Sequence, residues 1–201
     1  GKQVTTRDGV LTLLDDINFS IRAGTSVAIL GASGSGKTTL SGTLMQRLGA
    51  TRIRSDIERK RLFGLDSGAP SGSSNIYTED ASKRTYQHLA DLAVAITQGG
   101  YPVIVDATFL EQSERDRFRA LAVDLAVPFT ILHFDASAEE LSSRIQKRVE
   151  LGRDASEADV KVLQGQIKRY LPLGERETVE TIVIDTETEH PLDTVYKVLN
   201  R

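Results

Sequence analysis

The segment GASGSGKT, residues 31–38, decides the fold that we predict for this chain. It matches the pattern G-x-x-x-x-G-K-[ST] at every fixed position. It stands between an apolar run at residues 26–30 and a helical pattern that reaches residue 48. In such a loop the backbone N–H groups converge on phosphate oxygens at the N-terminus of a helix. The sequence therefore predicts a P-loop that binds ATP, although the loop alone does not distinguish transporters, switches, motors and kinases.

We expect the loop to hold the nucleotide together with Mg²⁺. Lys37 is expected to bridge the β and γ phosphates, and the Thr38 hydroxyl to join the Mg²⁺ shell. Asp106 ends the apolar run YPVIVD, and a carboxylate at the C-terminal end of a parallel strand faces the nucleotide crevice. We therefore predict a second Mg²⁺ contact at Asp106, with a helix N-cap as the alternative. The predicted nucleotide-binding residues are Gly31, Ala32, Ser33, Gly34, Ser35, Gly36, Lys37, Thr38 and Thr39.

A second acidic residue follows the next predicted strand, in TRIRSDIERKRLFG at residues 51–64. Asp56 at the tip of that strand could accept a proton from an attacking hydroxyl. The basic residues that follow it could hold an anionic group on the acceptor or on the transferring phosphate. The alternative is a capping aspartate beside a solvated basic helix face. The basic residues are Arg59, Lys60 and Arg61.

A cluster of basic residues surrounds a candidate helix break near Gly152. Arginines on a mobile segment over a P-loop can close on the transferring phosphoryl group and exclude water. Charges spaced three or four residues apart on a helix can also form a solvated face, so both interpretations stay open. The cluster consists of Arg144, Lys147, Arg148 and Arg153.

Strand and helix patterns alternate along the chain, which predicts parallel βα units in an α/β fold. We expect one domain over residues 1–201, with a β segment at residues 1–25 and the P-loop core at residues 26–201. One late helix, opened by a capping box at Ser156 and Asp159, is expected to bury Val160, Leu163, Ile167 and Tyr170. The predicted strands are residues 26–30, 51–55, 102–106, 129–135 and 181–185.

The amino-acid composition limits the kinds of partner that we expect for this chain. The 201 residues carry a formal net charge of −3, so no global basic field attracts nucleic acid or a membrane surface. The absence of cysteine excludes disulfides and thiolate metal sites and fits a reducing cytosol. No apolar run approaches the ~20 residues of a membrane span. We therefore expect a cytoplasmic monomer that acts on a small molecule, without nucleic-acid or membrane partners.

From about residue 45 the chain resembles a family of small P-loop kinases, the AAA_33-type predicted kinases, which are related to zeta toxins and to the kinase domain of polynucleotide kinase. The resemblance implies a three-layer α/β/α sheet in the kinase order 2-3-1-4-5. It implies that Asp56 is the general base, that Arg59 contacts the acceptor, and that Arg148 or Arg153 is the lid arginine. The stretches that carry it are RIRSDIERKRLFGL, IYTEDASKRTYQHLADLA, GGYPVIVDATFLEQSERDRF and GRDASEADVKVLQGQI.

Residues 4–44 resemble something else, the N-terminus of an ABC transporter ATPase, in which antiparallel strands precede the P-loop. The LSGGQ-like signature and the Asp-Glu pair of those ATPases are missing here. We interpret the chain as a fusion of two P-loop lineages, engineered or recombinant, with a crossover near residues 40–48. Three functions follow: an ATP-dependent small-molecule kinase, a nucleotide-binding module with weak or no phosphotransfer, or a transport ATPase half-site.

Overall fold

A computed structural model describes residues 2–6, 9–14, 26–66, 76–151, 160–188 and 191 of the chain. Its first two strands, β1 (Lys2–Thr6) and β2 (Gly9–Leu14), pair antiparallel as a two-stranded sheet of their own. This agrees with the antiparallel strands expected at the N-terminus, whereas residues 15–22 lie outside the described residues. Within the described part of the chain, no helix combines the length and the apolar character needed to cross a membrane.

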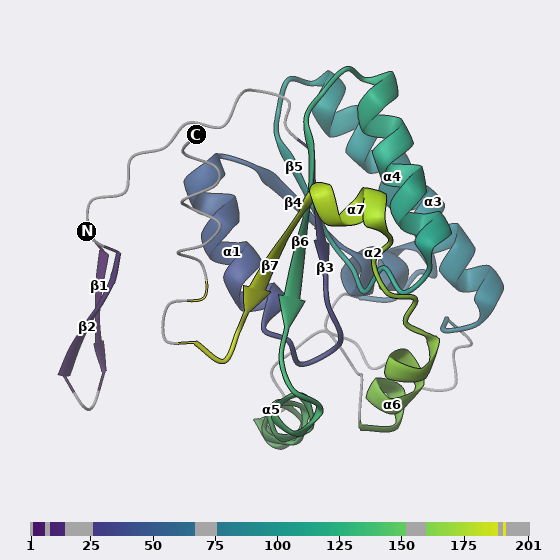
Figure 1. Ribbon diagram of the computed structural model, residues 1–201. Coiled ribbons are helices and arrows are strands. Elements are labelled where there is room, and N and C mark those ends of the chain that lie inside the picture. Colours follow the sequence, from purple (N-terminus) through teal and green to yellow (C-terminus); the bar gives the residue numbers. More distant parts are fainter. Residues whose placement is uncertain are drawn as a thin grey trace.

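The main sheet has five parallel strands in the order β4-β5-β3-β6-β7 (Figure 1). Counted from the P-loop strand along the chain, this is the predicted kinase order 2-3-1-4-5. The strand that ends in Asp106 pairs directly with the P-loop strand, with Ile29 opposite Asp106, so no further strand is inserted between them. The strands are β3 (Ser26–Leu30), β4 (Thr51–Arg54), β5 (Val103–Asp106), β6 (Phe129–Asp135) and β7 (Thr181–Asp185).

Helices cover both faces of this sheet because its central strand is apolar on both sides. Val27 and Ile29 pack on the face covered by α1 (Lys37–Leu48), in a cluster with Leu44. The alternate residues of β3 pack on the other face, against α3 (Glu79–Gln98) and α4 (Gln112–Asp124). Figure 1 shows the sheet between these two helix layers. The fold is a three-layer α/β/α P-loop fold, as predicted.

Two helices, α5 (Ala138–Leu151) and α6 (Val160–Arg169), lie beyond the carboxyl ends of the strands (Figure 1). They pack on the P-loop rather than on the sheet, in a small cluster of Leu141, Ile145 and Leu163 with Ala32. The expected apolar stripe of α6 is therefore partly wrong: Leu163 is buried, but Ile167 is 47% exposed. Ser156 and Asp159 lie outside the described residues, so the predicted capping box stays a prediction.

A buried ion pair fastens the last described helix, α7 (Glu175–Val179), to α4. Arg115 Nε donates to Glu177 Oε1 at 2.5 Å, and both side chains are almost fully buried. Arg115 also donates through Nη1 to the Phe109 carbonyl and through Nη2 to the Pro172 carbonyl. Burial opposes ionisation of Glu177, but the hydrogen bonds from Arg115 and Gly174 outweigh it and hold the pKa of Glu177 below its usual value. One guanidinium therefore joins three separate segments of the chain.

Candidate functional site

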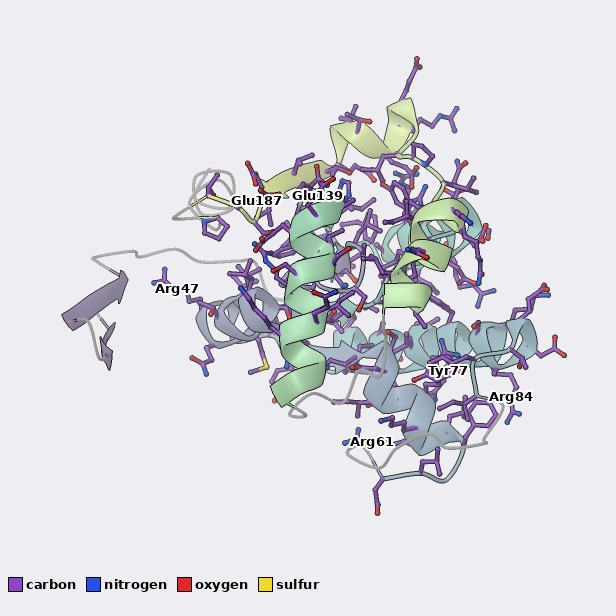
Figure 2. The ribbon with its side chains drawn as sticks, turned by 90° about the horizontal axis from the view of Figure 1, so that it is seen from below. Arg47, Arg61, Tyr77, Arg84, Glu139 and Glu187 are labelled. Atoms are coloured by element: carbon purple, nitrogen blue, oxygen red, sulfur yellow. The ribbon has the colours of Figure 1, made fainter. Side chains whose placement is uncertain are left out.

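The candidate site is an open cleft of about 1220 Å³ at the carboxyl ends of the parallel strands. Ligands in open α/β sheets bind at this edge. The P-loop forms one wall, and α2 (Ser55–Leu62) and α3 form another. Figure 2 shows α5 and α6 side by side, and it shows Arg61 and Tyr77 in the region of α2 and the start of α3. Residues of the P-loop, of α2 and of the end of β5 therefore share one cavity.

Close packing leaves the P-loop no room for side chains at two of its glycines. A Cβ at Gly31 would lie 2.7 Å from the Phe134 carbonyl oxygen. Gly34 has a φ of +88°, and a Cβ there would lie 2.8 Å from the Leu141 carbonyl oxygen of α5. Lys37 Nζ donates to the Ala32 carbonyl at 3.0 Å, so the ammonium group lies against the loop backbone. The loop is therefore a backbone cradle with one cation, and it fits a polyphosphate.

One polar atom of the cradle supports this fit. Ser35 is 1% exposed, and its Oγ has no hydrogen-bond partner among the described residues. Buried hydroxyls without a partner are rare in native proteins and call for an explanation. A phosphate oxygen or a Mg²⁺-bound water in the cradle would satisfy it. The side chain of Thr39, the last predicted cradle residue, lies outside the description.

The two predicted Mg²⁺ contacts, Thr38 and Asp106, are neighbours. Thr38 Oγ1 lies 3.5 Å from Asp106 Oδ2, and the Ser41 hydroxyl donates to the same oxygen at 3.2 Å. Arg52 Nη1 donates to the Thr38 carbonyl at 2.6 Å and to Ser41 Oγ at 2.8 Å. A hydroxyl and a carboxylate are the oxygen donors that Mg²⁺ takes when phosphates and water complete its shell. The residues present therefore fit the metal.

The ionised carboxylate of Asp106 is energetically unfavourable at this buried position. It is 5% exposed, and burial raises its pKa, while the positive charges of Lys37, Arg54 and Arg52 oppose that shift. A buried carboxylate is tolerated where it is paired or holds a metal. The alternative role as a helix N-cap is not formed, since α4 begins at Gln112 after an N-cap at Glu111.

Asp56 lies in the cleft, but in the first turn of α2 rather than at the tip of a strand, because β4 ends at Arg54. Two hydrogen bonds from Arg54 hold it, from Nε to Oδ1 at 3.2 Å and from Nη2 to Oδ2 at 2.6 Å. The backbone N–H of Ile57 also donates to Oδ1 at 2.9 Å. The carboxylate is thus fixed in orientation on the side of the cleft that faces the P-loop.

The basic residues after Asp56 do not act as one group. Arg59 lines the cleft, is 9% exposed, and donates to the Ile76 carbonyl at 2.9 Å. Burial lowers its pKa, and its guanidinium lies over the Tyr77 ring at 5.4 Å. Lys60 is 1% exposed and does not line the cleft, and Arg61 pairs with Glu58 at the surface. The alternative of a solvated basic face is therefore wrong for Arg59 and Lys60, and of the three basic residues Arg59 alone lines the cleft.

Among the basic residues of α5, the structure brings Arg144 to the P-loop. Arg144 lines the cleft, and its Nη1 would lie 3.8 Å from a Cβ at Gly36. It is held by Glu140 at 2.7 Å and by Thr186, whose hydroxyl accepts from Nη1 at 2.9 Å. The side chain of Arg148 and all of Arg153 lie outside the described residues, so the choice between them stays a prediction.

Residues that the sequence did not single out complete the cleft. Gln166 of α6 reaches the P-loop, where its Oε1 accepts from the Ser33 N–H at 3.0 Å. Arg169 pairs with Glu111 across the cleft at 3.8 Å. Glu114 lines the cleft with a buried Oε2 that has no partner among the described residues, and burial raises its pKa. Nothing in a single sequence marks Gln166, because its role depends on where α6 lies in space.

Comparison with known proteins identifies the family of the chain. Residues 27–173, well over half of the chain, match the model of the AAA domain family AAA_33. Among curated relatives, the oligopeptide transport ATP-binding protein OppD of Haemophilus influenzae is 40% identical over 58 residues. That match covers 29% of this chain and 17% of OppD, so the chain spans less than a fifth of that relative. The match to OppD is therefore confined to a short stretch. The lipoprotein-releasing system ATP-binding protein LolD 2 of Rhodospirillum rubrum matches over a longer stretch, at 28% identity over 177 residues, which cover 88% of this chain and 74% of LolD 2.

Solved kinases share the fold over nearly the whole chain. A gluconokinase from Sinorhizobium meliloti is 20% identical, with a TM-score of 0.63, and the match covers 89% of this chain and 93% of that one. A sugar kinase from Janibacter is 23% identical, with a TM-score of 0.64 and coverage of 87% and 92%. At these identities the likeness establishes the fold alone.

Proposed function

The chain belongs to the AAA domain family AAA_33, and from this membership and the site we propose that it is an ATP-dependent kinase that phosphorylates a hydroxyl of a small molecule. The observation that carries the proposal is the shared cleft. A P-loop with Lys37, the pair Thr38 and Asp106, and the held carboxylate of Asp56 all line it. Phosphoryl transfer needs mainly positioning and charge neutralisation, and these residues supply both.

The nucleotide half of the cleft would bind ATP through residues 31–39. Backbone N–H groups at the start of α1 and the charge of Lys37 would hold the phosphates. Thr38 and Asp106 would hold Mg²⁺, which when bound neutralises charge on the phosphate oxygens. Arg144 lies next to Gly36 and is held by Thr186, which supports a further contact to the nucleotide from α5.

On the acceptor side, Asp56 would accept the proton of the attacking hydroxyl. The hydroxyl oxygen forms a bond to the γ-phosphorus as the bond from that phosphorus to the β–γ bridging oxygen breaks. The products are the phosphorylated acceptor and ADP, and the proton goes to the Asp56 carboxylate. Arg59 would contact the acceptor from α2, and Glu114 would accept a hydrogen bond from one of its other hydroxyls.

The proposal is tested with γ-labelled ATP, Mg²⁺ and a panel of hydroxylated acceptors. Gluconate and simple sugars come first, because the solved neighbours are named for them. We expect label transfer to an acceptor by the wild type and by the control Asp124→Asn, an exposed position at the end of α4. Transfer should be lost in Lys37→Ala and fall sharply in Asp56→Asn.

The competing hypothesis is a nucleotide-binding module without phosphotransfer. It takes over if the wild type binds Mg²⁺ and ATP, transfers no label to any acceptor, and hydrolyses ATP slowly at a rate that Asp56→Asn leaves unchanged.

A further inference from the structure

Helix α6 packs on the P-loop through Leu163 and forms a hydrogen bond with it through Gln166. The Ser33 N–H donates to Gln166 Oε1 at 3.0 Å, although the two residues are far apart in the sequence. A backbone N–H can only donate, so the amide oxygen of Gln166 must face Ser33 and the amide nitrogen must face away from it. No described residue accepts a hydrogen bond from Nε2, and Gln166 lines the cleft. Its two N–H donors are therefore available to a ligand.

Helix α6 and the residues after it contact two segments that line the cleft. On one side it is bound to the P-loop at Ser33. Less than one helical turn further on, Arg169 pairs with Glu111, and Leu171 N donates to the Leu110 carbonyl at 3.0 Å, on the acceptor wall. Gln166 therefore contacts the phosphate cradle, while the end of α6 and the residues after it contact Leu110 and Glu111, which also line the cleft.

The neighbouring residue supports close approach of a ligand. Gly165 lies within α6 and lines the cleft, although glycine weakens a helix relative to alanine. Its φ is not positive, and no heavy atom of the described residues lies within 4 Å of a Cβ built there. Neither backbone conformation nor packing among these residues requires the glycine. Because Gly165 lines the cleft, a ligand bound there could use this open space.

We propose that Gln166 binds the γ-phosphate of the nucleotide, with Oε1 fixed by the Ser33 N–H and Nε2 donating to a γ-phosphate oxygen. This inference rests on the proposed nucleotide site. Ser33 precedes the N-cap residue Gly36 by three positions, so its N–H is not among the first-turn amides of α1. Its bond to Gln166 leaves those amides, at Lys37 and Thr38, to the β-phosphate. The amide of Gln166 thus extends the cradle to the terminal phosphate.

Calorimetry with Mg²⁺ and two nucleotides, ADP and the non-hydrolysable triphosphate AMPPNP, tests the inference. Gln166→Leu should weaken AMPPNP binding about tenfold, the size of one hydrogen bond to a charged group, and leave ADP binding unchanged. The control Gln164→Leu, at an exposed position of the same helix, should change neither affinity. Equal losses for ADP and AMPPNP, no loss at all, or tighter binding of AMPPNP by Gln166→Leu would overturn the inference.

Gly165→Ala provides a second test that separates a ligand contact from a folding defect. The added methyl group meets no described atom and favours the helix, so the melting temperature should stay equal or rise. AMPPNP binding should nevertheless weaken, because the methyl group enters the space beside the γ-phosphate. Unchanged AMPPNP affinity would remove the support that Gly165 gives and count against the inference.

These affinity measurements test the role of Gln166 whether or not the protein transfers a phosphoryl group. If AMPPNP and ADP respond as expected while no acceptor is phosphorylated, the kinase proposal fails and the role of Gln166 stands. If the wild type binds neither nucleotide, both fail.

Discussion

Arg54 holds the carboxylate of Asp56 with both arms of its guanidinium, at 3.2 Å and 2.6 Å. The two residues stand on either side of the boundary between β4 and α2, since Arg54 is the last residue of the strand and Asp56 the second of the helix. Such two-point contacts fix orientation as well as charge. The sheet therefore sets the direction in which the proposed base points.

This contact predicts that the contribution of Asp56 to kcat depends on Arg54. Asp56→Asn should lower kcat by about 10²–10⁴, the usual value of general-base assistance, and leave ATP affinity unchanged. Arg54→Met should lower kcat less, because the carboxylate remains but is no longer oriented. The double variant should be no slower than Asp56→Asn alone, as a double-mutant cycle on kcat would show. Additive losses would mean that Arg54 acts on the reaction independently of Asp56.

Lys37→Ala should abolish tight binding of ATP with Mg²⁺ and leave the fold intact. Lys37 supplies the side-chain charge of the cradle, and its Nζ donates to the Ala32 carbonyl of the same loop. Calorimetry measures the affinity, and circular dichroism at rising temperature measures the fold. Equal ATP affinity in the variant and the wild type would count decisively against the P-loop site.

Asp106→Asn should increase stability at neutral pH while it lowers activity. Burial raises the pKa of Asp106, so the folded state binds this proton more tightly than the unfolded state does, and the ionised form is the less stable one. The variant should therefore melt a few degrees higher at pH 7. This gain should shrink as the pH falls through the raised pKa and vanish below the usual value of 3.8.

The kinetic part of the same prediction is a fall in kcat of about a hundredfold or more at saturating ATP and Mg²⁺, because a neutral amide neutralises no metal charge. Melting curves across a pH series, beside the kinase assay, check both parts. A variant that is less stable than the wild type at pH 7 would show that the carboxylate is held more by its cations than it is penalised by burial.

Arg115→Met should be strongly destabilising, by about 3–5 kcal/mol, because it leaves Glu177 charged and buried. Urea unfolding at pH 7 measures the loss, and Arg117→Met, which removes a partly exposed arginine of the same helix with a solvent-exposed hydrogen bond to Gln87, should cost no more than about 0.5 kcal/mol. The lowered pKa of Glu177 means that the pair stabilises the protein fully above the usual value of 4.5. The difference between variant and wild type should therefore diminish in acid, and equal stabilities at pH 7 would refute the prediction.

Most of the sheet was predictable from the sequence, because its strands are short apolar runs between turn residues. Three of the five predicted strands have the observed bounds, and the other two differ by one residue, at Ser55 and Pro102. The placement of Asp106 beside Thr38 followed from the rule that parallel strands end at one edge. The fusion of two lineages stays a prediction, since no observation locates a junction within α1.

The rest of the site depends on contacts between distant segments. Arg52 and Arg54 lie two residues apart on β4, so they share one face of the strand, and this pattern could have marked them. Gln166 carries no such mark, because α6 was expected to pack its apolar residues into a core. It lies instead against α5 and the P-loop, which leaves Ile167 exposed and brings Gln166 to Ser33.

The strand order has a consequence for how the chain folds as it is made. Among the strands of the main sheet, β3 and β4 are synthesised first, yet they do not pair with each other, because β5 lies between them. Neither has a partner in the main sheet until residues 103–106 have been synthesised, and β3 acquires its second neighbour only with residues 129–135. Pairing across such separations slows folding and leaves apolar strands exposed in the meantime. The nascent N-terminal half therefore keeps these two strands without their main-sheet neighbour until β5 is made, and the four residues of β5 are the point at which the main sheet can first assemble.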